Sequence, residues 1–296
     1  MIAFFSVFGI ILLAVLLGGG TAGLTGVFVM GLRMPFLAVC SAHAAMAGAV
    51  YGVVLQERFG VALPADAAGF AGALLGAALL AYLLRRRSLD PNMALGALFS
   101  LMLGLTFLGI GLIRGPKSAA FGLLWGSPLF VTPGQTAVMA AVGVLLGVFL
   151  YIFHKELKVL LFSREMAAVL VPQGWILAAL LILIAGVITI NLEIAGGLLL
   201  FSLLTNPALA ALRVARSYRA TLVWSSLFGA GSALGGFLLA YALDLPAGAC
   251  IVLFSCAVLW GAAVWGKKRV LSAEKKGLSA EKKGLSAEKK GLSAEC

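Results

Sequence analysis

Three residues with metal-binding side chains lie close together in an apolar stretch near the start of the chain. Cys40, His43 and Met46 are spaced three residues apart, so in a helix they share one face. Thiolate, imidazole and thioether groups bind transition metals of borderline or soft character. If the stretch crosses a membrane, its ionisable residue is a candidate functional residue. The alternative is structural: His43 bonds a backbone carbonyl, and its two neighbours are packing residues.

A second unusual stretch contains Thr205, Asn206 and Pro207. Proline removes a backbone donor from a helix, so the chain is expected to bend here. Thr205 and Asn206 can supply oxygen ligands in a polar cavity, or they can satisfy the freed backbone of a simple kink. The sequence alone leaves both interpretations open.

Motifs typical of enzymes are absent from the sequence. It contains no G-x-x-x-x-G-K-[ST], H-E-x-x-H, C-x-x-C or G-x-S-x-G pattern, and it has only two histidines. We therefore expect no catalytic residues and no permanently bound cofactor.

The composition indicates a polytopic membrane protein. Of the 296 residues, 62% are hydrophobic and 11% are charged, against about 25% charged residues in soluble domains. Short charged clusters separate nine apolar segments, and a spanning helix needs roughly 20 such residues. The predicted fold is an all-α polytopic membrane protein of about nine transmembrane helices, at Val7–Leu32, Phe36–Leu55, Ala67–Leu84, Met93–Ile113, Ala137–Phe153, Trp175–Ile190, Ile194–Leu212, Ala220–Leu243 and Ala249–Trp265.

The basic residues predict the orientation. One set of alternate loops carries 13 Lys and Arg, and the other set carries only Arg58, Arg114 and Lys117. Because cytoplasmic loops hold the excess of Lys and Arg, the N-terminus is predicted outside and the C-terminus in the cytoplasm. The net charge of +11 then reflects topology, so we expect the lipid bilayer and no nucleic acid as a partner.

Three loops and the tail have distinct patterns. Residues 115–134 are apolar but broken by Gly and Pro, which fits either a re-entrant segment over a central cavity or an ordinary surface loop. Residues 154–174 predict an amphipathic surface helix. Arg213–Ala220 predicts a helix with one basic face, explained by orientation alone or by docking on a cytoplasmic partner. Residues 270–296 repeat GLSAEKK and predict a low-complexity cytoplasmic tail after a membrane domain of residues 1–269.

The ordered motifs resemble the permeases of metal-ion ABC importers, the zinc/manganese/iron family called ABC-3. Each motif is short, but together they run in the family's order through most of the chain. They are Leu32-Arg33-Met34 followed by Ala42-His43-Ala44, Leu124-Trp125-Gly126-Ser127, Phe162-Ser163-Arg164-Glu165-Met166-Ala167, Gly197-Leu198-Leu199-Leu200 through Pro207, and Asp244-Leu245-Pro246-Ala247-Gly248.

The resemblance implies a type II ABC importer permease in a bacterial inner membrane. Its expected partners are a second permease copy, separate ABC ATPase subunits and an extracytoplasmic metal-binding protein. Its expected substrate is a zinc, manganese or iron ion. The ATPase-coupling residues implied by position are Arg213, Arg216, Ser217 and Arg219, with residues 154–173 as an accessory contact.

One position departs from the family pattern. The family usually has Asp four residues before the second-span histidine, where this chain has Val39. His43 is the main predicted metal contact, Cys40 and Met46 are secondary ones, and Thr205 and Asn206 are predicted oxygen ligands. The missing carboxylate favours a softer metal, or another substrate. An importer of a chelated metal, haem or cofactor, an ATP-independent secondary transporter and an assembly factor remain alternatives.

Overall fold

The computed structural model describes residues 2–61, 63–85, 90–115, 126, 128–162, 173–196 and 200–266, and this part of the chain is helical without strands. Eight of its helices are long and apolar enough to cross a membrane. They are α1 (Ile2–Gly31), α2 (Phe36–Phe59), α3 (Ala65–Arg85), α4 (Pro91–Leu112), α6 (Pro133–Ile152), α9 (Gln173–Ala195), α11 (Tyr218–Leu243) and the C-terminal helix Ala247–Gly266. The shorter elements are the 3₁₀ turn η1 (Pro128–Phe130), α7 (His154–Phe162) and α10 (Leu200–Val214).

Each predicted apolar segment corresponds to a helix, so the predicted fold class is confirmed. The boundary between the sixth and seventh segments was wrong, because α9 continues past Asn191 to Ala195 and α10 begins only at Leu200. With 15 residues, α10 is about 22 Å long, which is less than the roughly 30 Å of a hydrocarbon core. The seventh predicted segment therefore corresponds to a short apolar helix that contains Pro207.

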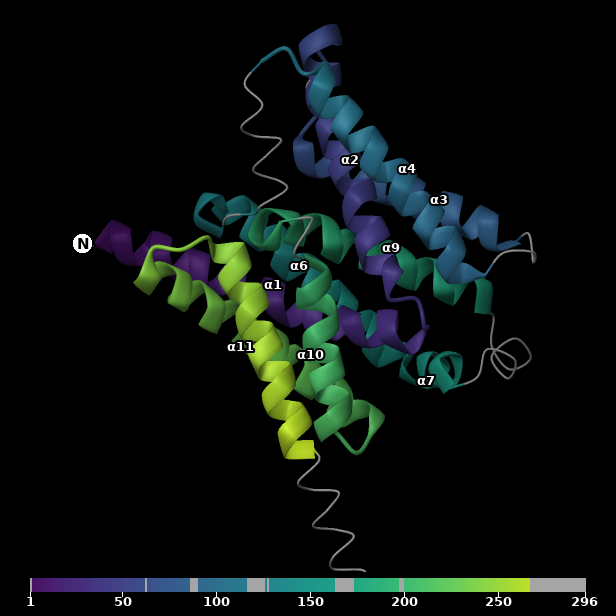
Figure 1. Ribbon diagram of the computed structural model, residues 1–296, viewed down its shortest axis with the longest axis vertical. Coiled ribbons are helices and arrows are strands. Elements are labelled where there is room, and N and C mark those ends of the chain that lie inside the picture. Colours follow the sequence, from purple (N-terminus) through teal and green to yellow (C-terminus); the bar gives the residue numbers. More distant parts are fainter. Residues whose placement is uncertain are drawn as a thin grey trace, which may run out of the picture.

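Six of the described helices form two groups that α9 connects. Helices α1, α10 and α11 pack against one another, and α2 packs against α3 and α4. Figure 1 shows α2, α3 and α4 together at the upper right, with α10 and α11 below them. Helix α9 contacts members of both groups and also α6. The second-span histidine therefore belongs to the group formed by α2, α3 and α4.

Small residues allow the closest helix crossings. A Cβ atom at Gly23 would lie within 3 Å of the Ser225 carbonyl oxygen, and the Ser225 hydroxyl donates a hydrogen bond to the Gly23 carbonyl. Gly48 and Gly72 place α2 and α3 in similar backbone contact. Glycine pairs of this kind let helices approach in lipid, where apolar burial from water supplies little driving force.

The connections carry the expected helix signals. Asp90 caps α4 by accepting from the amides of Asn92 and Met93, and Thr132 with Gln135 forms a capping box at α6. Asp244 ends α11 in the left-handed region with φ 55°, which turns the chain before the last helix. The amphipathic helix predicted after residue 153 is confirmed over α7.

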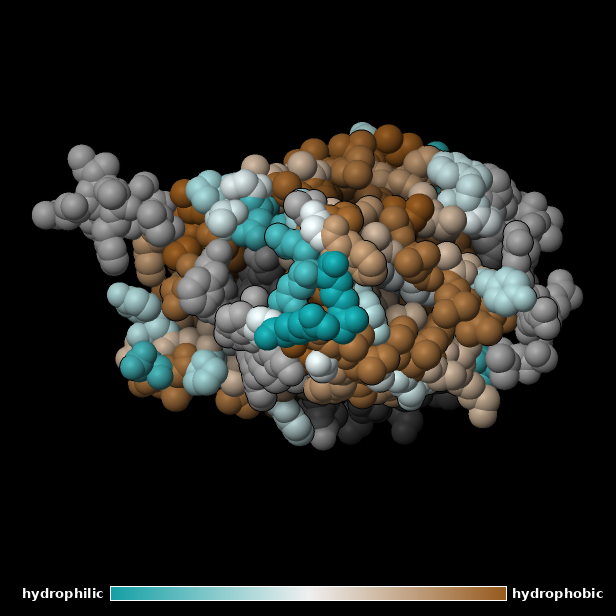
Figure 2. All heavy atoms as spheres, turned by 90° about the horizontal axis from the view of Figure 1, so that it is seen from above, coloured by the Kyte–Doolittle hydropathy of each residue, from teal (hydrophilic) through white to brown (hydrophobic). Residues whose placement is uncertain are grey.

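The outer surface of the helices is largely apolar. Exposed side chains include Leu75 on α3, Phe107 on α4 and Val144 on α6. Figure 2 shows an end face on which hydrophobic residues surround a smaller group of hydrophilic ones. Such a surface suits contact with lipid.

Some sequence-based predictions concern residues outside the described part of the chain. They are those for the GLSAEKK tail, for most of the loop at residues 115–127 and for the segment 163–172. These stay predictions.

Candidate functional site

His43 is buried within the first half of α2. The helix is rich in alanine here, and its small side chains let α3 approach closely. The His43 side chain is 1% exposed. An ionisable group this deep in an apolar protein is costly unless it is paired or functional.

The hydrogen bonding of His43 suits a neutral ligand. Its Nδ1 lies 2.9 Å from the Val39 carbonyl oxygen, one turn earlier in the same helix. A carbonyl only accepts, so Nδ1 carries the hydrogen and donates it. Nε2 is then left with a lone pair, and it is buried without a hydrogen-bond partner among the described residues. A histidine ligand to a metal commonly has this arrangement, in which one ring nitrogen donates a hydrogen bond and the other is free to bind the metal.

Helix α4 covers the histidine. The rings of His43 and Phe99 are 4.9 Å apart between centroids, with an interplanar angle of 85°. Two turns further along α4, the Thr106 hydroxyl donates to the Met102 carbonyl at 2.8 Å and lies 3.5 Å from the His43 carbonyl. The same face of α4 therefore lies against α2 at two places, at the imidazole ring of His43 and at its backbone carbonyl.

Cys40 and Met46 are not gathered with His43 into one ligand group. Cys40 is buried in the main apolar core, whereas Met46 packs with Val50, Val54 and others near the far end of α4. Six residues apart on a helix, the two side chains differ in direction by about 120°. Within the described residues, no group of three or more His, Cys, Asp or Glu side chains could hold a metal ion. The roles of Cys40 and Met46 as secondary ligands stay predictions.

Thr205 and Asn206 form hydrogen bonds inside the protein. The Thr205 hydroxyl donates to the Phe201 carbonyl at 2.9 Å within α10. The Asn206 amide donates to the Ser255 hydroxyl at 2.9 Å and to the Cys256 sulfur at 3.2 Å. Asn206 thus connects the proline-containing helix to the C-terminal helix. The oxygen-ligand role of both residues stays a prediction.

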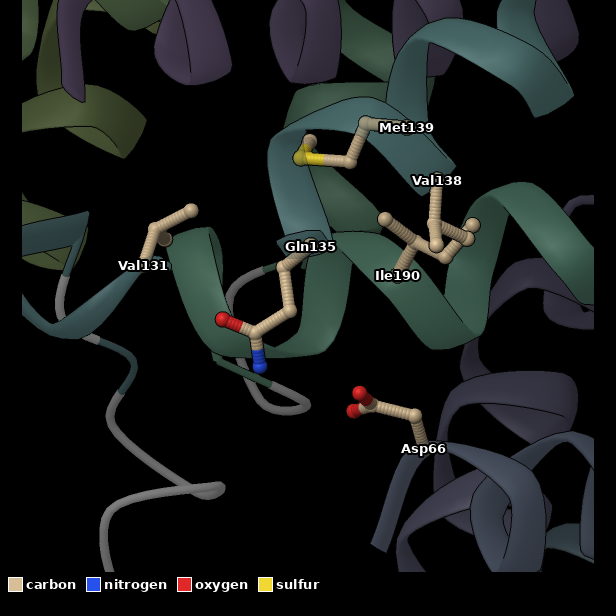
Figure 3. A pocket seen from close by; sticks show the side chains of 6 residues that line it. All are labelled: Asp66, Val131, Gln135, Val138, Met139 and Ile190. Atoms are coloured by element: carbon tan, nitrogen blue, oxygen red, sulfur yellow. The ribbon is translucent and has the colours of Figure 1, made fainter. Parts of the chain in front are cut away.

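A pocket of about 80 Å³ lies between α3, α6 and α9. Asp66 at the start of α3 lies opposite Gln135 of α6, as Figure 3 shows, and Val131, Val138, Met139 and Ile190 complete the lining. The Gln135 carbonyl oxygen is already used by Thr132 in the capping box, so its amide nitrogen is the group left for the pocket. By the predicted orientation, this pocket is on the extracytoplasmic side.

The predicted coupling residues lie around the connection between α10 and α11 rather than on one helix. Arg213 lies in the last turn of α10, Arg216 in the connection and Arg219 in the first turn of α11, and all three are exposed. The Ser217 hydroxyl caps α11 by accepting from the Ala220 amide at 3.3 Å. The prediction of one basic helical face was wrong, because this serine cap starts a new helix within the segment.

Comparison with known proteins agrees with this architecture. The model of the ABC 3 transport family matches residues 6–265. The chain belongs to the ABC 3 transport family. Family membership confirms the resemblance drawn from the ordered motifs and fits a multi-pass membrane protein with eight potential spans among the described helices.

Two curated relatives and one solved structure show what this ABC 3 family chain is similar to. The manganese import system permease protein ScaB of Streptococcus gordonii is 28% identical over 81% of this chain and 84% of its own length. The zinc transport system membrane protein TroC of Treponema pallidum is 26% identical over 88% and 89%. The structure of PsaBC from Streptococcus pneumoniae in complex with Fab shares the fold, with a TM-score of 0.76, 24% identity and coverage of 88% and 95%.

Sequence reasoning missed two residues of the site. Phe99 lies in an apolar stretch where any side chain would fit the pattern, and only the packing of α4 on α2 reveals its contact with His43. Asp66 carried a usable signal, since it is an acid at the predicted outer end of a span. Its part in a pocket depends on the position of α6, which lies far away in the sequence.

Proposed function

We propose that this chain is the permease subunit of an ABC importer that carries a divalent transition-metal ion into the cell. The main support is the free Nε2 of His43, buried in a spanning helix of an ABC 3 family protein. A neutral imidazole with a single open lone pair binds a metal ion without holding it in a closed site. Transport requires such weak coordination, because the ion must also leave.

Zinc is the substrate we favour over manganese and iron. The relatives ScaB and TroC are named for manganese and zinc, so the family accommodates both. Manganese prefers oxygen ligands, and imidazole nitrogen suits zinc. Val39 stands where the family usually offers a carboxylate, so a preference for the softer ion follows.

ATP hydrolysis belongs, in this proposal, to a separate ATPase subunit. The exposed arginines at the turn between α10 and α11 supply a cytoplasmic docking point, and α7 supplies a second amphipathic contact. An extracytoplasmic metal-binding protein delivers the ion on the opposite face. A second permease copy is part of the proposal, because the described part of one chain offers a single buried imidazole and no group of three or more His, Cys, Asp or Glu side chains that could hold a metal ion.

Metal uptake by cells carrying His43→Ala tests the proposal. We expect uptake of radioactive zinc to fall at least about tenfold, since the open ligand is lost. The matched control is His154→Ala, which alters the only other histidine, at the start of α7. Equal uptake by His43→Ala and the unaltered protein at equal membrane abundance would refute the role of His43.

The same assay separates the alternatives. An importer of a chelated metal, haem or another cofactor takes up the complexed ligand better than free zinc and tolerates the loss of His43. A secondary transporter retains uptake when the ATPase is absent. The proposal requires uptake of the free ion and dependence on the ATPase.

A further inference from the structure

The side chain of Phe99 on α4 lies against the ring of His43 on α2. The two rings meet edge to face, at 4.9 Å and 85°. His43 is 1% exposed, while Phe99 is half-buried. A partly exposed phenyl ring thus lies against a buried imidazole.

Hydrogen bonds attach α4 near α2 at both ends. At one end, the Asn92 side chain donates to the carbonyl of Arg33, just before α2, at 3.4 Å. At the other end, the Glu57 carboxylate on α2 accepts from the amides of Arg114 and Gly115 at 2.9 and 3.2 Å. Helix α4 runs alongside α2 between these contacts (Figure 1).

Access to His43 therefore depends on a side chain rather than on departure of the helix. With both ends of α4 held, moving the whole helix breaks the Asn92 and Glu57 contacts together. Rotating one half-buried phenyl ring breaks neither. Aromatic side chains at the edge of a packed core change rotamer far more readily than packed helices separate.

We propose that Phe99 is a gate residue whose ring covers His43 in this conformation and exposes the Nε2 lone pair when it rotates away. The inference rests on the proposed function in one respect, namely that His43 meets the transported cation. In the closed position the ring excludes water and ions from the imidazole. In the open position a divalent cation reaches it.

Chemical modification of His43 tests the gate without any transport measurement. Diethyl pyrocarbonate reacts with accessible neutral imidazoles, and the full-length chain has only two, His43 and His154. The reagent is applied to membrane vesicles containing the full chain, and each histidine is quantified by peptide mass spectrometry. The rate at His154 serves as the internal standard. We expect His43 to react slowly in the unaltered protein and about tenfold faster or more in Phe99→Ala.

The control variant is Leu98→Ala, at the neighbouring position of the same helix. Leu98 is buried in the main core, so its truncation also removes packing, but it carries no ring that could cover His43. His43 should stay protected in Leu98→Ala. Equal modification of His43 in both variants, or no increase in Phe99→Ala, would overturn the gate.

A failure of the gate is distinguishable from a failure of the proposed function. If Phe99→Ala leaves His43 protected while His43→Ala abolishes zinc uptake, only the gate is wrong. If Phe99→Ala exposes His43 but His43→Ala transports normally, the cover exists and the function assigned to His43 is wrong. Phe99→Leu, which keeps an apolar side chain of intermediate size, is expected to give an intermediate modification rate.

Discussion

At the scale of single residues, His43 shows how a backbone hydrogen bond selects the chemistry of a side chain. The Val39 carbonyl holds Nδ1 at 2.9 Å, so the neutral ring presents Nε2. The carbonyl belongs to Val39, the position at which the family resemblance led us to expect an aspartate. The backbone of Val39 thus orients the imidazole, while its apolar side chain supplies no oxygen ligand.

Restoring the carboxylate should change metal preference. Val39 is half-buried, one turn from His43, so an aspartate has room to reach the same side of α2. We expect Val39→Asp to raise manganese uptake relative to zinc by about tenfold, because carboxylate oxygen suits the harder ion. Competition between the two isotopes in one uptake assay measures the ratio. Val39→Asn, similar in size but uncharged, should leave the ratio near that of the unaltered protein, and an equal shift in both variants would show that charge is not the cause.

Asp66 gives a second prediction for a single residue. Its carboxylate is the acid of the pocket between α3, α6 and α9, on the predicted outer side. Attraction between an exposed charge and a cation weakens as salt screens it. Asp66→Asn should therefore slow zinc uptake a few-fold at low ionic strength and have little effect at high ionic strength. A loss that is independent of salt would instead indicate a structural role.

At the scale of helices, the close crossings depend on a few glycines rather than on glycine content. A Cβ atom at Gly26 would lie less than 3 Å from the Leu204 carbonyl oxygen, whereas nothing lies within 4 Å of a Cβ at Gly231. A backbone atom in contact with an added Cβ atom cannot move aside as the end of a flexible side chain can. Spacing of small residues alone does not separate these two cases, and the structure does.

The contrast predicts opposite effects of one substitution. Gly26→Ala forces α1 and α10 apart and should lower the free energy of unfolding by about 1–3 kcal/mol. Gly231→Ala meets open space and should be neutral or stabilising by up to about 1 kcal/mol through helix propensity. Unfolding in mixed detergent micelles compares the two. Similar losses in both variants would show that the crossing does not limit stability.

The arginine turn between α10 and α11 is also an element with a testable role. Arg216 is exposed between the end of α10 at Val214 and the start of α11, which Ser217 caps. Reversing its charge with Arg216→Glu should abolish association with the ATPase subunit and reduce ATP-dependent zinc uptake at least about tenfold, as loss of a docking charge does at interfaces. Arg114→Glu, exposed at the opposite end of the molecule by predicted orientation, is the control. Association is measured by co-purification from membranes, and retention of the ATPase by Arg216→Glu would refute the docking role.

At the scale of the whole molecule, apolar segments and charge clusters were sufficient to predict the fold class. Apart from the boundary between the sixth and seventh, the segments were located correctly because a membrane-spanning helix must satisfy its own backbone and exclude charge. The end of α9 was misplaced because the polar Asn191 donates to the Val187 carbonyl at 2.8 Å and stays within the helix. A hydropathy pattern does not indicate whether a polar side chain is hydrogen-bonded within its own helix in this way.

The candidate site was only partly predictable. His43 was found because an imidazole is unusual in such a segment. Cys40 and Met46 were grouped with it by spacing alone, whereas the packing of α3, α4 and α9 around α2 distributes them to different surroundings. Phe99 could not be found, since its importance comes from a contact between helices that no pattern along one helix encodes.

Transport by the purified chain in proteoliposomes decides most directly whether import depends on a partner ATPase and on His43. The permease is reconstituted with and without the ATPase subunit, and zinc accumulation is followed with an internal fluorescent indicator after addition of the metal-binding protein and ATP. We predict accumulation only when both the ATPase and ATP are present, and none with His43→Ala. Sustained zinc accumulation by the chain alone, without an ATPase, would contradict this mechanism.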